Sequence, residues 1–328
     1  MTEEILANLY RIEIPLPQSP LKAVNSYVIK GPERNLIIDT GWNQEVCMNA
    51  MQIGLKELQV DLKKTDLFIT HLHADHLGLA SSLVTETSKI YFNQPDAERL
   101  KGGFLWDDFV SFARLNGYPE KEIEDVGRSH PGLKFRSKET PVFHTLKEGD
   151  PISIGNYAFR CVSTPGHSFG HLCLYEPDKK ILVAGDHILN DITPNIQLWA
   201  DDWNPLKLYL ESLDKVYKFD IELVLPGHRN IFRDYRKRID ELRQHHEKRF
   251  NEILSILGKK EQNAFQVASQ MSWDIVYDSW DLFPVSQKWF ATGEAIAHLK
   301  YLDEKGMIRK EMRGKKRVFS LNSTHPIR

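Results

Sequence analysis

The sequence has little cysteine and no long hydrophobic run. Only 3 of its 328 residues are cysteines, Cys47, Cys161 and Cys173, and this odd, widely spaced set argues against a disulfide framework and for a reducing compartment. No stretch of about eighteen apolar residues occurs, as a membrane-spanning helix would need. The N-terminal segment has acidic residues where a secretory signal needs basic ones. We therefore expect a cytoplasmic protein without a membrane partner.

The chain also lacks the composition of a disordered or low-complexity protein. Hydrophobic residues make up 41% and charged residues 27% of the sequence, which is typical of a globular protein. With 328 residues it is about twice the size of a usual domain, so we expect two domains. Histidine, in contrast, is abundant, with 13 residues. Any metal chemistry should therefore use imidazole and carboxylate ligands rather than thiolates.

Short apolar runs alternate with amphipathic stretches over the first two-thirds of the chain. Eight of these runs predict strands, at residues 27–29, 36–39, 67–70, 89–92, 157–163, 172–175, 181–184 and 222–225. Apolar residues at helical spacing predict helices at 50–58 and 206–216. Hairpins mixed with helix-covered strands favour an α/β (α+β) fold of layered sheets with helices outside.

Residues 95–128, between two predicted strands, are rich in aromatic residues and prone to form helices. We expect a helical insertion over residues 95–140. Two interpretations remain open for it. It could be a lid over the substrate, with Trp106 and Phe109 as substrate contacts, or a helical pair that packs on the sheet.

From Tyr235 the pattern becomes helical and poor in strands. Helices are predicted at 236–257, 265–271 and 292–306, followed by two strand-like runs within 307–319. Helix, helix and then hairpin is the order of a winged helix. We therefore predict a catalytic domain at residues 1–240 and a winged-helix-like C-terminal domain at residues 241–328.

A predicted strand is directly followed by the run His-Leu-His-Ala-Asp-His at residues 71–76. Because residues two apart in an extended segment point the same way, His71 and His73 can bind one ion, while Asp75 and His76 address a neighbouring position. Such a run arises by chance in a chain of this composition with a probability of roughly 10⁻³.

Three further candidate ligands follow predicted strands, and each comes directly after a glycine. They are His167, Asp186 and His228. Glycine lets the backbone turn sharply, so these side chains can leave the strand ends and enter a shared cleft. Together with the run at 71–76 they predict a metal site.

These residues resemble the motifs of the metallo-β-lactamase fold superfamily. The matching motifs are LIIDTG with Asp39, the run at 71–76, TPGHSFGH with His167, AGDH with Asp186 and LPGH with His228, in the family's order. The resemblance implies an αββα sandwich with the site at one edge. It also implies a ligand set: His71, His73 and His167 for a first metal, Asp75, His76 and His228 for a second, and Asp186 bridging both.

Three neighbours of the ligands are expected to support them. By the same resemblance Asp39 orients the ligand-bearing loop rather than binding a metal. His171 and His187 lie close in sequence to ligands, and we expect them to hold ligands in place, with substrate contact as the alternative.

A binuclear site of this kind generates a nucleophile. Two divalent cations can lower the pKa of a bridging water from about 15.7 towards about 7 and polarise a carbonyl oxygen. The resulting hydroxide would attack an ester, thioester or lactone, with Asp75 and Asp186 as the catalytic carboxylates. Five imidazoles and two carboxylates suit zinc, our expectation, as well as iron or manganese. The formal charge of the loaded site favours a small anionic substrate.

Beyond His228 the chain is similar to β-lactamase-like and glyoxalase II-like hydrolases with a C-terminal winged helix. Some of these hydrolyse thioesters and others cut single-stranded RNA. Residues 292–328 carry nine Lys and Arg against four acids, and Lys315, Lys316 and Arg317 could contact phosphates. One alternative is therefore an endoribonuclease assisted by the basic domain.

A second alternative is a non-catalytic nucleic-acid-binding or interaction protein. The intact ligand set argues against it, because an inert site would be expected to lose at least one of its ligands. The C-terminal domain could also cover the cleft or form the contact of a homodimer.

Overall fold

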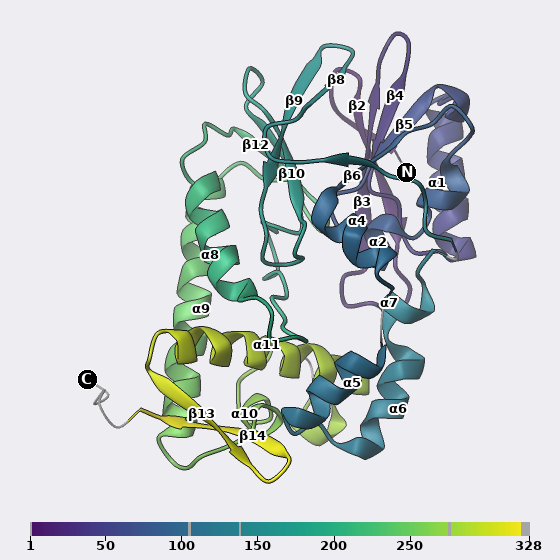
Figure 1. Cartoon of the computed structure of the whole chain (residues 1–328). Coiled ribbons are helices and arrows are strands. Elements are labelled where there is room, and N and C mark those ends of the chain that lie inside the picture. The colour runs from purple at the N-terminus through teal and green to yellow at the C-terminus, as the bar shows by residue number, and fades with distance from the viewer. Residues whose placement is uncertain (1, 104–105, 138, 275–276, 323–328) are drawn as a thin grey trace. The chain divides into compact units, whose positions relative to one another are not determined.

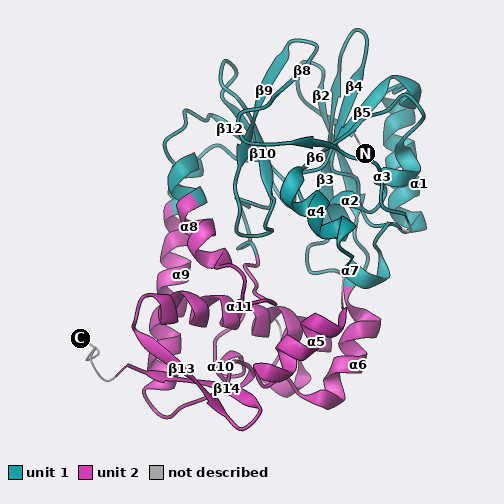
Figure 2. Ribbon diagram, viewed as in Figure 1, with its two compact units in different colours: residues 1–104, 131–194, 212–239 teal, residues 105–130, 195–211, 240–328 magenta. Residues whose placement is uncertain are grey.

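The computed structural model describes residues 2–103, 106–137, 139–274 and 277–322, which group into two compact units (Figure 2). Unit 1 comprises residues 1–104, 131–194 and 212–239, and unit 2 comprises 105–130, 195–211 and 240–328. The last boundary lies beside the one predicted from the sequence. Residues 105–130 and 195–211, which we predicted within the first domain, instead cluster with unit 2. The physical reason is aromatic packing inside unit 2, where Trp106 and Trp199 both lie against Trp289.

Unit 1 is built on two β-sheets. The first has the strand order β1 (Thr2–Leu6), β2 (Leu9–Pro15), β3 (Ala23–Lys30), β4 (Asn35–Ile38), β5 (Thr65–Phe68), β6 (Ile90–Asn93), β7 (His144–Leu146). It is antiparallel from β1 to β4 and parallel from β4 to β7. The second sheet has the order β12 (Leu223–Pro226), β11 (Ile181–Gly185), β10 (Leu172–Glu176), β9 (Tyr157–Ser163), β8 (Pro151–Ile154). Only β11 and β12 are parallel in it.

A hydrophobic core fills the space between the two sheets of unit 1. Tyr27 and Phe68 from the first sheet share one buried cluster with Phe159 and Leu174 from the second. Burial of such side chains is the main favourable contribution to folding, at about 1.5–3 kcal/mol each. The strands β3, β5, β10 and β11 are buried along nearly their whole length, because they are covered on both faces.

Helices cover the outer faces of the sandwich (Figure 1). On the first sheet, α1 (Glu45–Glu57) places Met51 in a buried cluster with Ile12 and Leu67. On the second, α8 (Pro205–Val216) places Lys215 Nζ 2.7 Å from the carbonyl oxygen of Ser163. The predicted αββα sandwich is confirmed. All eight predicted strands are present, and β1, β2, β7 and β8 are additional.

The remaining helices of unit 1 are short. They are α2 (Ala74–Leu77), α3 (Ala80–Leu83), α4 (Gln94–Lys101) and α7 (Pro131–Lys134), with the 3₁₀ turn η1 (Leu62–Lys64). The predicted ligands Asp75 and His76 lie within α2, directly after the extended residue His73; His71 lies in the bend before it.

Unit 2 contains helices and one hairpin. Its elements are α5 (Trp106–Leu115), α6 (Glu120–Ser129), residues 205–211 of α8, most of α9 (Tyr235–Leu257), α10 (Ala264–Ala268), the 3₁₀ turn η2 (Trp280–Leu282), α11 (Val285–Glu304), β13 (Ile308–Arg313) and β14 (Lys316–Leu321). The three predicted helices and the hairpin at 307–319 are confirmed, whereas their identity as a winged helix stays a prediction. No helix in the described part of the chain has the length and apolar character needed to cross a bilayer.

Candidate metal centre

The candidate ligands lie at the carboxyl ends of strands from both sheets. In the first sheet β4 and β5 are parallel; Asp39 follows β4, and His71 lies just beyond β5. In the second sheet β11 and β12 are parallel; Asp186 follows β11, and His228 lies just beyond β12. His167 comes from the loop between β9 and β10. Since the carboxyl ends of parallel strands meet at one edge of a sheet, the fold gathers these side chains.

Three histidines form the first group. One ring nitrogen each from His71, His73 and His167 lies within 4.8 Å of the others. The Nε2 atom of His71 is 3.0 Å from Nδ1 of His73. Ligands about 2 Å from a tetrahedral ion lie about 3.4 Å apart, so the two nitrogens are spaced like ligands of one cation.

Asp75, His76 and His228 form the second group. His228 Nε2 and His76 Nε2 lie 3.3 and 3.8 Å from Oδ2 of Asp75. The carboxylate of Asp186 reaches both groups. Its Oδ2 is 3.4 Å from Nε2 of His167 and 3.4 Å from Nε2 of His228, and its Oδ1 is 3.5 Å from Nε2 of His76. This carboxylate is therefore placed to bridge two cations.

Three buried atoms at the centre have no hydrogen-bond partner in the described part of the chain: His76 Nε2, His228 Nε2 and Asp186 Oδ1. An unsatisfied buried polar group costs about 1–3 kcal/mol. The second nitrogen of each histidine is occupied, because His76 Nδ1 lies 2.7 Å from Asp39 Oδ2 and His228 Nδ1 lies 2.6 Å from the Ala23 carbonyl. Both Nε2 atoms are then directed towards Asp186. The donor set fits divalent cations, and these clusters are typical of binuclear sites.

Asp39 organises ligands of both groups. It is buried and has a left-handed backbone with φ of 60°. Its carboxylate accepts hydrogen bonds from the Thr70 amide (2.8 Å), from Thr70 Oγ1 (2.8 Å) and from His76 Nδ1 (2.7 Å). Since Thr70 Oγ1 donates to Asp39, it accepts from Nδ1 of His71 at 2.9 Å, which leaves the Nε2 lone pair of His71 for a cation. This is the supporting position that the sequence resemblance implied.

His171 holds the backbone next to the carboxylate of Asp186. The Asp186 amide donates to Nε2 of His171 at 3.1 Å, so Nδ1 carries the proton and donates to Thr164 Oγ1 at 2.8 Å. Both nitrogens are thereby occupied, and His171 is not available as a ligand. Gly185 has a φ of 48°, and a Cβ atom there would lie 2.7 Å from His171 Nε2, so this close approach requires glycine. His187 is buried, with its ring 6.3 Å from that of His171.

The two groups differ in protonation. Burial, together with neighbouring His167, lowers the pKa of His73 to about 3, so this imidazole is neutral. Burial also acts on His228, but the carboxylates of Asp186 and Asp75 outweigh it and raise its pKa to about 10. Burial would raise the pKa of Asp75, yet His76 and His228 lower it to about 2. A cation entering the second group must therefore displace protons.

Two supports were missed from the sequence, and the first is β3. Asn25 Nδ2 donates to the carbonyls of Pro226 (3.0 Å) and Arg229 (2.9 Å). The Tyr27 hydroxyl donates to the Pro226 carbonyl at 2.8 Å. These bonds fix the turn that carries His228. The signal in the sequence is weak: an Asn-Ser pair inside a strand that is otherwise mostly apolar.

The second missed support is Asp96 in α4. Its carboxylate is buried and contacts both the loop of residues 71–73 and the loop that follows His167. Burial raises the pKa of Asp96, while hydrogen bonds, that from the Gly170 amide first, act in the opposite direction. No ligand-like spacing marks this residue in the sequence.

The predicted substrate contacts Trp106 and Phe109 lie on α5. Both are half-buried and belong to unit 2, where the Trp106 ring lies 5.3 Å from that of Trp289 and 6.2 Å from that of His130. The ligands belong to unit 1. The structure therefore assigns Trp106 to the packing of unit 2, and contact with substrate stays a prediction for both residues.

Comparison with known proteins identifies the family. The model of the metallo-beta-lactamase superfamily matches residues 20–228, which include every candidate ligand. The human acyl-coenzyme A thioesterase MBLAC2 is 28% identical over 221 residues, covering 63% of this chain and 74% of that protein. "Probable metallo-hydrolase YqjP" of Bacillus subtilis is 26% identical over 314 residues, covering 92% and 93%.

Solved structures resemble nearly the whole chain. A metallo-beta-lactamase family protein from Thermus thermophilus has a TM-score of 0.82 at 25% identity and covers 97% of this chain and 100% of its own. A beta-lactamase domain protein from Burkholderia ambifaria has a TM-score of 0.84 at 26% identity, covering 98% and 94%. With its paired His and Asp clusters, the chain belongs to the metallo-beta-lactamase superfamily and is one of its metallo-hydrolases.

Proposed function

We propose that this metallo-hydrolase cleaves a small anionic acyl thioester to a carboxylic acid and a thiol. The observation that carries the proposal is the carboxylate of Asp186, which lies within 3.5 Å of histidine nitrogens from both ligand groups. Two divalent cations bound there would supply a hydroxide nucleophile at neutral pH and polarise the carbonyl oxygen. The similarity to an acyl-coenzyme A thioesterase over 63% of the chain favours a thioester among the possible carbonyl substrates.

The residues of the chain have separate tasks in this proposal. One cation would be held by His71, His73 and His167, a second by Asp75, His76 and His228, and Asp186 would touch both. Asp39 keeps the Nδ1 proton of His76 on the side away from the cations. Because the ligands are buried, charges there act through a low effective dielectric, which strengthens the attraction of the loaded site for an anion.

Zinc is the proposed metal, since it accepts imidazole and carboxylate ligands in a site that keeps a position open for water. The cytoplasm is the proposed compartment. Cys47, Cys161 and Cys173 are free and buried, and burial raises the pKa of Cys173 to about 12, so this thiol is un-ionised. Free thiols of this kind suit a reducing environment.

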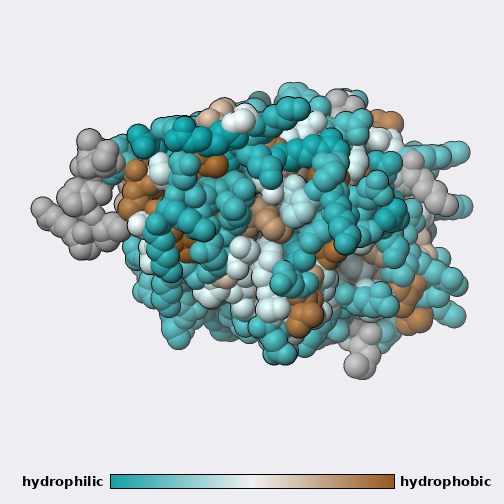
Figure 3. Space-filling model, turned by 90° about the horizontal axis from the view of Figure 1, so that it is seen from below, coloured by the Kyte–Doolittle hydropathy of each residue, from teal (hydrophilic) through white to brown (hydrophobic). Residues whose placement is uncertain are grey.

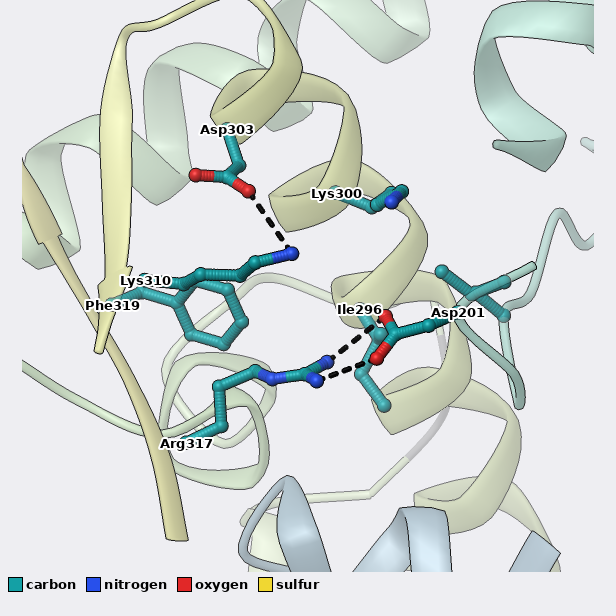
Figure 4. A pocket seen from close by; sticks show the side chains of 8 residues that line it. Asp201, Ile296, Lys300, Asp303, Lys310, Arg317 and Phe319 are labelled. Atoms are coloured by element: carbon teal, nitrogen blue, oxygen red, sulfur yellow. Dashed lines mark hydrogen bonds and ion pairs between the residues drawn. The ribbon is translucent and has the colours of Figure 1, made fainter. Parts of the chain in front are cut away.

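The arrangement of charge on unit 2 favours a small substrate over RNA (Figure 4). Arg317 donates to both carboxylate oxygens of Asp201, at 3.1 and 2.6 Å, and Lys310 Nζ lies 3.4 Å from Asp303. These cations are neutralised within unit 2, whereas a phosphate backbone would need them free. The exposed lysines at 315 and 316 remain as candidate phosphate contacts.

For unit 2 we propose a winged-helix module made of α10, α11 and the β13–β14 hairpin. Its expected tasks are covering the substrate or forming a homodimer contact. On the face drawn in Figure 3, hydrophobic residues lie in small separate patches among hydrophilic ones. Small patches of this kind do not mark a membrane-binding surface.

The proposal is tested by a substrate panel assayed on one preparation of the full chain. The panel contains acyl-coenzyme A and acyl-glutathione thioesters, a lactone, a phosphodiester and single-stranded RNA, with elemental analysis of the same protein. We expect thiol release from a thioester, dependent on bound metal. His73→Ala should lose this activity and part of the metal without unfolding. If the protein hydrolyses the lactone or the RNA and leaves the thioesters intact, the proposed substrate is contradicted.

A further inference from the structure

Asp96 is a buried carboxylate to which the proposed reaction assigns no task. It is the third residue of α4, and its exposed fraction is 0%. Its amide donates to Oδ1 of the helix N-cap Asn93 at 2.7 Å. A carboxylate removed from water is costly unless several donors surround it. Here one donor is Nδ2 of Asn93, at 3.5 Å, and the others come from two loops that carry histidine ligands.

Both oxygens of the Asp96 carboxylate are used. Oδ2 accepts the Leu72 amide at 3.1 Å and the Ser168 hydroxyl at 3.0 Å. Oδ1 accepts the Gly170 amide at 2.8 Å. Leu72 is the residue between the first two histidines of the first group, and Ser168 directly follows the third. One side chain therefore joins the backbone segments that carry all three ligands.

The packing at Gly170 gives independent evidence that the two segments are held tightly. A Cβ atom on this residue would lie 1.7 Å from Asn93 Oδ1 and 2.7 Å from the Asp96 amide nitrogen. The loop after His167 can approach the start of α4 so closely only because the residue is glycine. The contact is thus part of how the loop is placed.

We infer that Asp96 is a positioning residue that sets the distance between the His71–His73 segment and the His167 loop, and with it the affinity of the first ligand group for its cation. This inference rests on the binuclear site of the proposed function. Asp39 reaches ligands of both groups, whereas Asp96 contacts only segments of the first. Loss of Asp96 should therefore lower the affinity for one of the two cations and leave the other unchanged.

The test is Asp96→Asn, titrated as metal-free full-length protein with Co²⁺ alone and followed by visible absorption in competition with a chelator. The amide preserves the shape, but in either orientation its NH₂ group faces a backbone amide, that of Leu72 or that of Gly170. We expect one Co²⁺ equivalent to bind about 10–100-fold more weakly with an altered spectrum. The other equivalent should keep the affinity of the wild type.

Asp66→Asn is the matched control. Asp66 is also a buried aspartate of unit 1, and its carboxylate accepts from Arg34 Nη2 (2.6 Å) and from the Lys89 amide (2.8 Å), away from the ligand loops. The Asp66→Asn variant should be less stable than the wild type but should bind both Co²⁺ equivalents with unchanged affinity. Ser168→Ala removes a single hydrogen bond to Asp96 and should weaken the binding of the same Co²⁺ equivalent severalfold. This variant provides the test if Asp96→Asn does not fold.

The outcomes separate this inference from the proposed function. If the wild type binds two Co²⁺ and both Asp96→Asn and Ser168→Ala bind them like Asp66→Asn, the role of Asp96 is refuted and the metal site stands. If the wild type binds fewer than two, the binuclear site fails and the inference fails with it. If the wild type binds two Co²⁺ but cleaves no thioester, only the proposed substrate is refuted, because the role of Asp96 is measured by metal affinity.

Discussion

Both units bury histidines beside a carboxylate, but the two clusters are built differently. In unit 1 the histidine and aspartate side chains of the metal centre direct ligand atoms towards one another across strand ends of two sheets. In unit 2, His246 lies beside His298, and His245 Nε2 is 3.9 Å from Glu294 Oε1. His298 Nδ1 donates to the Glu294 carbonyl at 2.8 Å, so its Nε2 accepts from His246 Nδ1 at 3.0 Å. Within the described residues of unit 2, no three ligand atoms come within 4.8 Å of one another.

The difference shows what distinguishes a metal site from a satisfied polar core. Nε2 of His246, Nε2 of His245 and Nε of Arg249 also lack hydrogen-bond partners among the described residues, yet they belong to no group of three ligand atoms within 4.8 Å of one another. In unit 1, three such atoms, on His76, Asp186 and His228, come from three different elements and share one space. Burial of histidine next to an acid is therefore not sufficient. Convergence of at least three ligand atoms is the feature that indicates a cation.

The largest expected contrast comes from neutralising one buried carboxylate in each unit. Asp186→Asn removes the charge that touches both ligand groups, so both bound metal and hydrolysis should fall. Loss of a residue that only supports a ligand costs up to about 100-fold in metal affinity or activity, so loss of Asp186 should lower hydrolysis by more than that. Glu294→Gln makes the matched change in unit 2 and should leave the metal content intact. Elemental analysis and kcat measure both. Equal metal content in the two variants would remove the distinction between the clusters.

The pH dependence of stability isolates the cluster in unit 2. Burial lowers the pKa of His298 to about 4. As pH falls below the ordinary value of about 6.5, the unfolded chain binds a proton that the folded chain rejects, so the free energy of unfolding decreases until about pH 4. From pH 6.5 to pH 5 the loss should be about 2 kcal/mol. His298→Gln should not show that part of the decrease.

Tryptophan fluorescence during urea unfolding is suited to this measurement. Of the seven tryptophans only Trp42 lies in unit 1, and the others lie in unit 2. His144→Gln is the control, because His144 is exposed on β7. The pH dependence of the control should match that of the wild type. If His298→Gln also matches it, protonation of this buried histidine does not oppose folding.

The structure brings the candidate ligands together, as the sequence predicted, because each one is marked locally. The run at 71–76 and the glycine turns before His167, Asp186 and His228 combine a strand end with a coordinating side chain. The supports carry no such mark. Asp96 and Asn25 act through hydrogen bonds to segments 24 to 204 residues away. Nothing in the sequence distinguishes them from the other polar residues of the chain.

The grouping of α5 and α6 with unit 2 escaped prediction for a similar reason. Lys288 Nζ lies 2.9 Å from Glu122 Oε1, across 166 residues of sequence. The Tyr118 hydroxyl donates to the Val285 carbonyl at 3.1 Å across 167 residues. The helix-prone composition of residues 95–128 predicted helices there, but the partner of an amphipathic face is determined by tertiary packing. A boundary drawn along the sequence could not show an insertion that packs with a distant segment.

A smaller effect is expected from the ion pair that neutralises the hairpin. Arg317→Ala removes both hydrogen bonds to Asp201. The side chains of Arg317 and Asp201 are 13% and 44% exposed, so solvent screens the pair and the loss of stability should be about 1 kcal/mol. Arg309→Ala, on the exposed side of β13, is the control and should change stability by less than about 0.5 kcal/mol. An equal change in both would show that the buried side of the hairpin is not specially paired.

The smallest effect is expected from Lys315→Ala with Lys316→Ala. Both side chains are exposed at the hairpin turn, so the free energy of unfolding should change by less than about 0.5 kcal/mol and thioester hydrolysis should stay unchanged. Arg317 is kept in this variant, because its removal would disturb an ion pair and confuse folding with phosphate contact. RNA cleavage by the wild type that falls in the double variant, while thioester hydrolysis survives, would assign unit 2 to nucleic-acid binding. That result would also contradict the distinction between unit 1, whose unpaired polar atoms are placed to bind a cation, and unit 2, whose charged side chains pair with one another.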